Sequence, residues 1–176
     1  HAFEYRRRNK IPEEQVAMAA IVQEQLAPVS SGVLFTRDPI SEENHFVISS
    51  TLGLGEGVVS GSTNTDRFVL KPETGELISS TVAEKPTRFI AIESGGISSA
   101  PVPPEESNTP ALATAQLTVL TALGRQLAEL FGCPQDIEFA FTGEAVHILQ
   151  SRPLTAISED VEPDEPWDAS LDLSFT

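Results

Sequence analysis

The sequence Asp-Ile-Glu-Phe-Ala-Phe fills residues 136–141, and Ala-Val-His-Ile-Leu-Gln-Ser-Arg fills residues 145–152. Both stretches contain the β-branched and aromatic residues that are common in strands. The Thr-Gly-Glu segment between them, residues 142–144, is typical of a turn. Together they predict two antiparallel strands that form a hairpin.

Successive side chains of a strand point to opposite faces, so the first predicted strand has an apolar face and a polar face. The apolar face carries Ile137, Phe139 and Phe141, and we expect it to lie in the core. The other face carries Asp136 and Glu138. Two carboxylates on one face of a strand make the polar side of this hairpin a candidate for chemistry.

The length of the loop decides which residues face each other across the hairpin. We expect a three-residue loop, residues 143–145, which places Glu138 opposite Gln150 and Asp136 opposite Arg152. Directly opposed residues have Cβ atoms ~5 Å apart. That separation lets a carboxylate oxygen and an amide oxygen hold one hard cation such as Mg²⁺.

Two interpretations of these polar side chains remain open at this point. In the first, Glu138 and Gln150 hold a metal ion, and Arg152 lies beside it and forks onto a phosphate. In the second, all three are ordinary polar residues on the solvent side of a hairpin. Spacing alone does not separate the two, because a carboxylate–amide pair is far less specific than a zinc-type array of cysteines.

The rest of the chain predicts an α+β fold with a mostly antiparallel sheet and packed helices, because strands cluster with short turns between them. Further strands are expected at residues 16–26, 32–35, 45–51, 67–71 and 77–82. A helix is expected from Pro110 to residue 131, with Thr109 as its N-cap and Gly132 as its C-cap. Residues 93–109, rich in Gly, Ser and Pro, are expected to form a loop.

Composition narrows the class of protein. The 176 residues suffice for one domain with a core, and no apolar run reaches the ~20 residues that span a bilayer. The net charge is −15, from 26 acidic and 11 basic residues, so the surface repels nucleic-acid phosphates. We therefore expect neither a membrane nor a nucleic acid as partner. Cys133 is the single cysteine, which fits a reducing compartment, and we expect the cytoplasm.

Charge is uneven along the chain. Residues 6–10 are basic and predict a solvated helix face or, less simply, a phosphate-binding patch. Residues 159–165 are acidic and interrupted by proline, which predicts an exposed linker over residues 156–176.

Five segments carry a resemblance to a known family. They are Met-Ala-Ala-Ile-Val-Gln at residues 18–23, Ser-Gly-Val-Leu-Phe-Thr-Arg-Asp-Pro at 31–39, Gly-Leu-Gly-Glu-Gly-Val-Val-Ser-Gly at 53–61, Pro-Gln-Asp-Ile-Glu at 134–138 and Ile-Leu-Gln-Ser-Arg-Pro-Leu at 148–154. In this order they resemble the ATP-binding domain of phosphoenolpyruvate synthase, pyruvate phosphate dikinase and rifampicin phosphotransferase. The last segment is the most specific.

The resemblance implies an ATP-grasp fold, in which ATP lies between two lobes, and this chain is similar to the second lobe. It implies that Glu138 and Gln150 hold Mg²⁺ on the phosphates of ATP. Arg152 resembles the catalytic arginine that contacts the transferring phosphate, and Asp136 resembles an acidic residue of the same nucleotide-binding motif.

Other nucleotide-binding residues follow from the same resemblance. Val22 and Gln23 lie on the segment that borders the adenine in such domains. Glu56 lies in the glycine-rich segment at residues 53–57, which is either a phosphate cradle or a tight turn that packs near the nucleotide. The segment lacks the Lys and Ser/Thr of a P-loop.

The resemblance also sets expectations for the whole protein. Residues 1–155 are expected to be part of an ATP-binding domain that lacks its first lobe, and to be inactive alone. The full protein is expected to pass phosphate from ATP through a phosphohistidine domain to pyruvate, so that ATP, the first lobe and the phosphohistidine domain are the partners. One alternative is a rifampicin phosphotransferase-like enzyme with another acceptor. Another is a truncated, incompetent half-domain or an interaction module.

Overall fold

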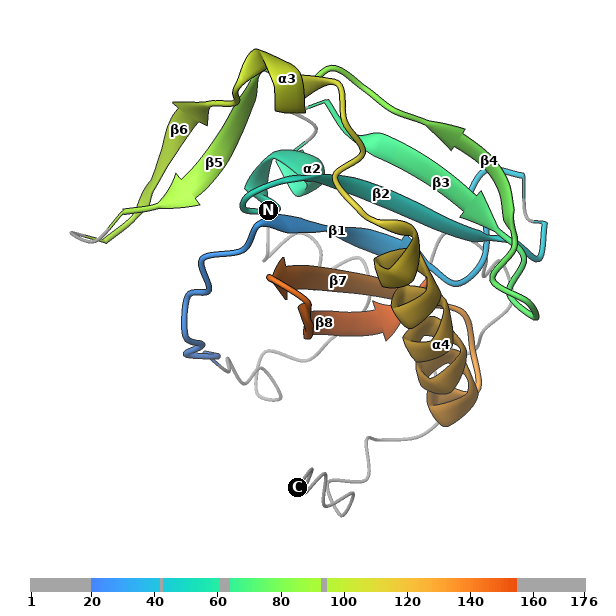
Figure 1. The fold of residues 1–176 in the computed structure, drawn as a ribbon. Helices are drawn as coiled ribbons and strands as arrows, with labels where there is room; N and C mark the ends of the chain where they lie inside the picture. The colour runs from blue at the N-terminus through green and yellow to red at the C-terminus, as the bar shows by residue number, and fades with distance from the viewer. Residues whose placement is uncertain (1–19, 42, 61–63, 93–94, 155–176) are drawn as a thin grey trace, which may run out of the picture.

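The computed structural model describes residues 20–41, 43–60, 64–92 and 95–154. Six antiparallel strands form one sheet in the order β4-β3-β2-β1-β7-β8 (Figure 1). The strands of this sheet are β1 (Ser30–Phe35), β2 (Phe46–Leu52), β3 (Asp66–Leu70), β4 (Leu77–Thr81), β7 (Gln135–Thr142) and β8 (Ala145–Pro153). The expected antiparallel α+β fold is confirmed. The basic run at residues 6–10 and the predicted linker at 156–176 lie outside the described residues.

A separate two-stranded sheet projects from one end of the main sheet (Figure 1). It consists of β5 (Thr87–Ala91) and β6 (Ile97–Pro101) and is called the β5–β6 hairpin below. The helices of the described part are α2 (Glu56–Ser60), α3 (Pro104–Ser107) and α4 (Thr114–Phe131). The prediction of a loop over residues 93–109 is therefore wrong, because β6 and α3 lie within it. β6 forms because its backbone pairs with β5. Its Ser- and Pro-rich sequence contains few residues that favour strands, so the sequence did not predict it.

Helix α4 covers one face of the six-stranded sheet (Figure 1), and the core lies between them. The buried side chains of this core include Leu34, Ile48, Phe68, Leu120, Ile137, Phe139 and Phe141. Gly124 lies where the helix approaches the sheet, since a Cβ there would lie 2.9 Å from Leu34 Cδ2 and 3.0 Å from Phe46 Cε2. The apolar face predicted for β7 thus lies in the core, as expected.

The predicted start of the long helix is wrong, whereas its end is confirmed. Gly132 is the C-cap in the left-handed conformation, with φ of 67°. The helix begins at Thr114 and not at Pro110, because residues just before it are used by the core. Ala111 is buried, and its N–H donates to Asp66 Oδ2 at 2.7 Å. This long-range contact holds the segment out of the helical path.

The strand predicted at residues 16–26 is not found in its described part. Residues 20–29 have no regular structure, and Ile21 and Val22 are 90% and 98% exposed. Both sides of β1 are already paired, with β2 on one side and β7 on the other. A strand formed by residues 20–29 would therefore find no free edge of β1 to pair with.

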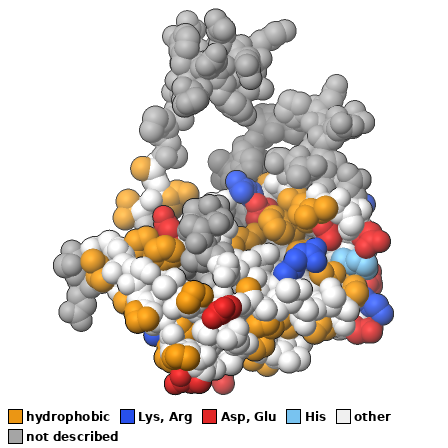
Figure 2. Space-filling model, turned by 90° about the horizontal axis from the view of Figure 1, so that it is seen from above, with side chains coloured by type: hydrophobic (Ala, Val, Ile, Leu, Met, Phe, Trp, Pro, Cys, Tyr) orange, Lys and Arg blue, Asp and Glu red, His pale blue; other side chains and the backbone are white. Residues whose placement is uncertain are grey.

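Charged side chains of both signs share the surface. Figure 2 shows Lys and Arg side chains beside Asp and Glu side chains along the right-hand edge of one face. In the described part of the chain, no helix has the length and apolar character needed to cross a membrane.

The turn that follows β1 is organised by Asp38. Its Oδ1 accepts the N–H of Ile40 at 2.9 Å and that of Ser41 at 3.3 Å, and its Oδ2 accepts a bond from Arg67 at 3.2 Å. Burial raises the pKa of Asp38, but these hydrogen bonds and the Arg67 charge together leave the pKa below its ordinary value of 3.8.

This pKa shift predicts a pH-dependent stability difference for Asp38→Asn. A folded pKa below the unfolded one means that the ionised carboxylate stabilises the fold, fully above pH 3.8, with loss as pH falls through the lowered folded pKa. Urea unfolding should therefore show the variant less stable than the parent at pH 7, with a gap that shrinks in acid. A gap that stays constant down to acid pH would contradict the assignment.

The core predicts a second stability effect. Ile137 is 0% exposed beneath α4, so Ile137→Ala should lower the free energy of unfolding by ~2–5 kcal/mol. The matched control is Ile78→Ala, because Ile78 is 44% exposed and its truncation should change stability by less than about 0.5 kcal/mol. Equal losses in the two variants would show that the core is placed wrongly.

Candidate functional site

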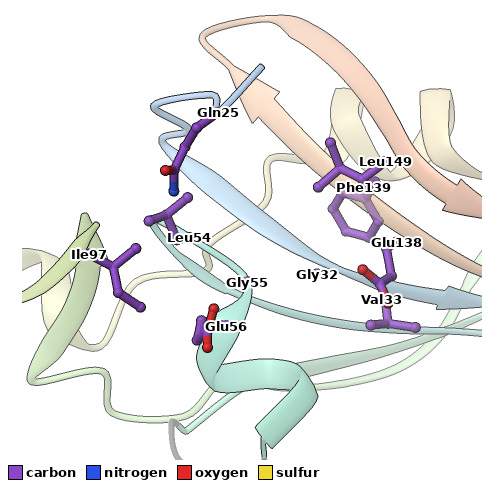
Figure 3. Close-up of a pocket in the computed structure, with 10 residues that line it drawn as sticks. All are labelled: Gln25, Gly32, Val33, Leu54, Gly55, Glu56, Ile97, Glu138, Phe139 and Leu149. Carbon is purple, nitrogen blue, oxygen red and sulfur yellow. The ribbon is translucent and has the colours of Figure 1, made fainter. Parts of the chain in front are cut away.

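A cleft of about 440 Å³ opens on the face of the sheet opposite α4 (Figure 3). Its walls come from β1, β7, β8, the loop before α2 and the β5–β6 hairpin. Glu138 on β7 and Glu56 at the start of α2 lie on two of its sides, and Ile97 of β6 lies on a third (Figure 3). Elements distant in sequence thus meet around one hollow that carries two carboxylates.

A second hollow of about 340 Å³ adjoins the first. The two share Gln25, Leu54, Gly55 and Leu149 among their lining residues. Gln23, the other residue expected to border the base, lines the second hollow. Val22 lines neither hollow and is 98% exposed, and its place beside the base stays a prediction.

The hairpin of β7 and β8 brings the predicted polar residues together. Glu138 pairs with Gln150, and Asp136 pairs with Arg152, so both predicted pairings are confirmed. Glu138 is half-buried, with Val33 of β1 beside it across the other edge of β7. Within the described chain, no side-chain hydrogen bond or ion pair engages Glu138 or Gln150.

The expected three-residue loop is wrong, although the pairings that it gave for Asp136 and Glu138 are correct. Thr142 pairs with Ala145, which leaves a two-residue loop, and Gly143 has the positive φ of 66° that such loops need. A β-bulge between Glu138 and Phe139 shifts the register by one residue, because Leu149 is an extra residue in β8. Glu138 therefore still pairs with Gln150. The bulge directs this additional apolar side chain to both hollows.

Arg152 is held in place by Asp136. Its Nε donates to Asp136 Oδ2 at 2.9 Å, and its second nitrogen lies 2.8 Å from the same oxygen. The side chain of Asp136 is 12% exposed, whereas that of Arg152 is 63% exposed. The carboxylate therefore orients the guanidinium while leaving most of its surface open to a further anion.

The glycine-rich segment is a tight, closely packed turn. Gly53 has a φ of 75°, and a Cβ there would clash with the carbonyl oxygen of Phe89. The next residue, Leu54, donates its N–H to that oxygen at 2.9 Å. The glycine thus forms a tight turn that lets the main sheet pair with the β5–β6 hairpin, whereas the phosphate cradle considered from the sequence stays a prediction. Glu56, which follows it, is exposed and lines the cleft.

Sequence reasoning missed the apolar part of the site. Leu54, Ile97 and Leu149 line the cleft, but apolar residues in such segments are indistinguishable from core. For Leu149 a signal existed, since a two-residue turn and the Glu138–Gln150 pairing are compatible only if β8 contains one extra residue.

The donor set at Glu138 and Gln150 fits Mg²⁺ better than a transition metal. Carboxylate and amide oxygens are hard ligands, and Mg²⁺ commonly takes one or two protein ligands and fills its other positions with water and phosphate oxygens. The described residues contain no group of three or more His, Cys, Asp or Glu that could enclose a metal. Any Mg²⁺ held here would thus rely on few protein ligands.

Comparison with known proteins gives the family. The chain matches the pyruvate phosphate dikinase, AMP/ATP-binding domain family over residues 1–172. It is 40% identical over 157 residues to a rifampicin phosphotransferase of Streptomyces sviceus, covering 89% of this chain and 18% of that protein. It is 37% identical over 164 residues to a probable phosphoenolpyruvate synthase of Methanothermobacter thermautotrophicus, covering 93% and 24%. It is also 35% identical over 158 residues to the prodigiosin synthesizing transferase of Serratia marcescens, covering 88% and 18%.

The family match gives the class of the domain, which is nucleotide-binding. The chain belongs to the AMP/ATP-binding domain family of pyruvate phosphate dikinase, a family of phosphotransferases. This confirms the resemblance inferred from the five segments. The chain spans about a fifth to a quarter of the length of these relatives.

Proposed function

We propose that the described sheet and cleft are the second lobe of an ATP-grasp-like site, in a protein that transfers phosphate from ATP. The observation that carries the proposal is the row of Glu138, Gln150 and Arg152 on the cleft side of the β7–β8 hairpin, with the first two free of side-chain partners in the described chain. A half-buried carboxylate without a partner favours a cation. An exposed, oriented guanidinium beside it favours a phosphate.

Each residue has a distinct part in this proposal. Glu138 and Gln150 would hold Mg²⁺, which supplies charge neutralisation to the phosphates of ATP. Arg152, oriented by Asp136, would bind the transferring phosphoryl group and stabilise the charge spread over its oxygens. Gln23 would border the base, and Glu56 would face the nucleotide across the cleft. The protein supplies alignment and electrostatics rather than a covalent intermediate on this lobe.

The rest of the reaction lies beyond these residues. We propose that residues 1–155 complete their site with a first lobe elsewhere in the protein, and that residues 156–176 link to a following domain. A histidine of a phosphohistidine domain would take the phosphate and pass it to pyruvate. Relatives named for rifampicin, phosphoenolpyruvate and prodigiosin each match 88–93% of this chain. This supports the proposal that the acceptor is set outside this domain, and an acceptor other than pyruvate is the second candidate.

Removing the carboxylate tests the metal assignment. In the full-length protein, Glu138→Ala should weaken Mg-ATP binding by at least about tenfold, because the cation loses its charged ligand. Isothermal titration calorimetry measures the affinity, and circular dichroism should show an unchanged fold. Glu144→Ala is the matched control, because Glu144 lies exposed in the turn of the same hairpin.

The same titration separates the rival readings of the chain. Binding by the full-length protein and not by residues 1–176 alone supports a site shared between two lobes. Wild-type affinity in Glu138→Ala would refute the metal assignment. Absence of binding by the full-length protein would instead favour an interaction module that has kept the fold without its function.

The bulge gives a second prediction for the same site. Deletion of Leu149 should leave a regular hairpin in which Glu138 still pairs with Gln150, so the fold should persist. The cleft would lose an apolar wall, and Mg-ATP should bind about tenfold more weakly, as expected for ~1.4 kcal/mol of lost apolar contact. Ile148→Ala is the control, because Ile148 is equally exposed, at 36%, but lies on the opposite face. Unchanged affinity after deletion would show that Leu149 does not contact the nucleotide.

A further inference from the structure

The most deeply buried charges of the described chain form a pair outside the cleft. Asp66 at the start of β3 is 0% exposed, Lys85 is 1% exposed, and Lys85 Nζ donates to Asp66 Oδ1 at 2.6 Å. Burial of two charges is costly and gives no net stability unless further hydrogen bonds satisfy the remaining polar atoms. The nucleotide site described above makes no use of this pair.

The hydrogen bonds of Asp66 hold two segments that are far apart in sequence. Oδ1 also accepts the N–H of Ala83 at 2.9 Å, and Oδ2 accepts the N–H of Ala111 at 2.7 Å. Ala83 lies just before β5, and Ala111 lies just after α3. A single carboxylate therefore fastens the chain where it enters and where it leaves the β5–β6 hairpin region. Lys85 adds a bond to the carbonyl of Ala83 at 2.8 Å.

Further bonds carry this anchorage to the cleft. The N–H of Lys85 donates to Ser107 O at 2.7 Å, and the N–H of Val102 donates to Pro86 O at 2.9 Å. The segment before β5 and the segment after β6, called the two legs of the hairpin below, are therefore hydrogen-bonded to each other. The hairpin then pairs through Phe89 with the loop at Gly53 and Leu54. Ile97, at the start of β6, forms the cleft wall that faces Glu56 and Leu54 (Figure 3).

We propose that Asp66 and Lys85 are positioning residues that fix the β5–β6 hairpin as a wall of the nucleotide cleft. The inference that the pair affects nucleotide affinity rests on the proposed function. The physical reason is that a carboxylate has two oxygens. Here each oxygen accepts a backbone N–H from a different leg of the hairpin. An apolar pair of equal volume fills the same space but fixes neither leg.

The test separates positioning from general stability with a charge-neutral pair. Asn has one acceptor oxygen, so the double variant Asp66→Asn/Lys85→Met removes both buried charges and retains at most one of the two leg bonds. Lys85→Met alone keeps both bonds to Asp66 but leaves the carboxylate without its counter-charge. Hydrogen–deuterium exchange is measured in the full-length protein, without nucleotide, alongside urea unfolding.

In the double variant, the amides of Leu54 and Val102 should exchange at least about tenfold faster, while those of β1 and β7 change only as far as global stability changes. Mg-ATP should bind about tenfold more weakly. Lys71→Met is the control: it breaks an exposed ion pair with Glu76, 2.7 Å long, in the β3–β4 turn. It should alter neither the exchange at the hairpin nor the affinity.

Two outcomes overturn the proposal. One is unchanged protection of the hairpin amides in a folded double variant. The other is amide exchange in β1 and β7 that becomes faster by the same factor as in the hairpin, because this would indicate a merely structural role. If the double variant fails to fold, Asp66→Asn alone decides by the same comparison, because asparagine has a single acceptor oxygen and keeps at most one of the two leg bonds. If the parent protein binds no Mg-ATP, the proposed function fails, but the exchange result still decides whether the pair holds the hairpin.

Discussion

Strand β7 is paired on both edges, with β1 on one side and β8 on the other, and this double pairing ties the core to the site. Ile137 and Phe141 on one face are buried in the core, and Glu138 on the other face lines the cleft. Because side chains alternate, a slip of one residue would exchange the two sets. The burial of the phenylalanines of β7 therefore also fixes the position of the carboxylate. Stability and function depend on the same register.

The part of the site formed by the β7–β8 hairpin was predictable because its information is local. A period-two pattern and a glycine turn lie within residues 136–152, and they suffice to oppose Glu138 to Gln150. The predicted three-residue loop and the observed two-residue loop with a bulge give the same pairing beyond the bulge. The register was thus correct at Asp136 and Glu138, although the turn and the pairs next to it were not. The predicted hairpin has no bulge, so it did not place Leu149 in the cleft.

The features that sequence reasoning missed depend on partners far along the chain. The helix starts late because Ala111 is bound by Asp66, 45 residues earlier. The β5–β6 hairpin is fastened at Gly53 and at the Asp66–Lys85 pair, and its Ser- and Pro-rich second strand carries little local signal. Local propensity cannot report such contacts, because the stabilising groups are brought together only when the sheet has formed.

An acidic chain must distinguish carboxylates that hold the fold from those that act on a ligand, and here the partners make the distinction. Asp38, Asp66 and Asp136 are each largely buried, and each is satisfied by backbone N–H groups, a basic side chain or both. Glu138 is half-buried, and no side chain of the described residues neutralises it. With a net charge of −15, the surrounding field raises the free energy of such a carboxylate and of any phosphate brought near it. A cation bound between the two would relieve both repulsions, so at the proposed site this field would oppose the magnesium complex of ATP, with its smaller negative charge, less than it opposes free ATP.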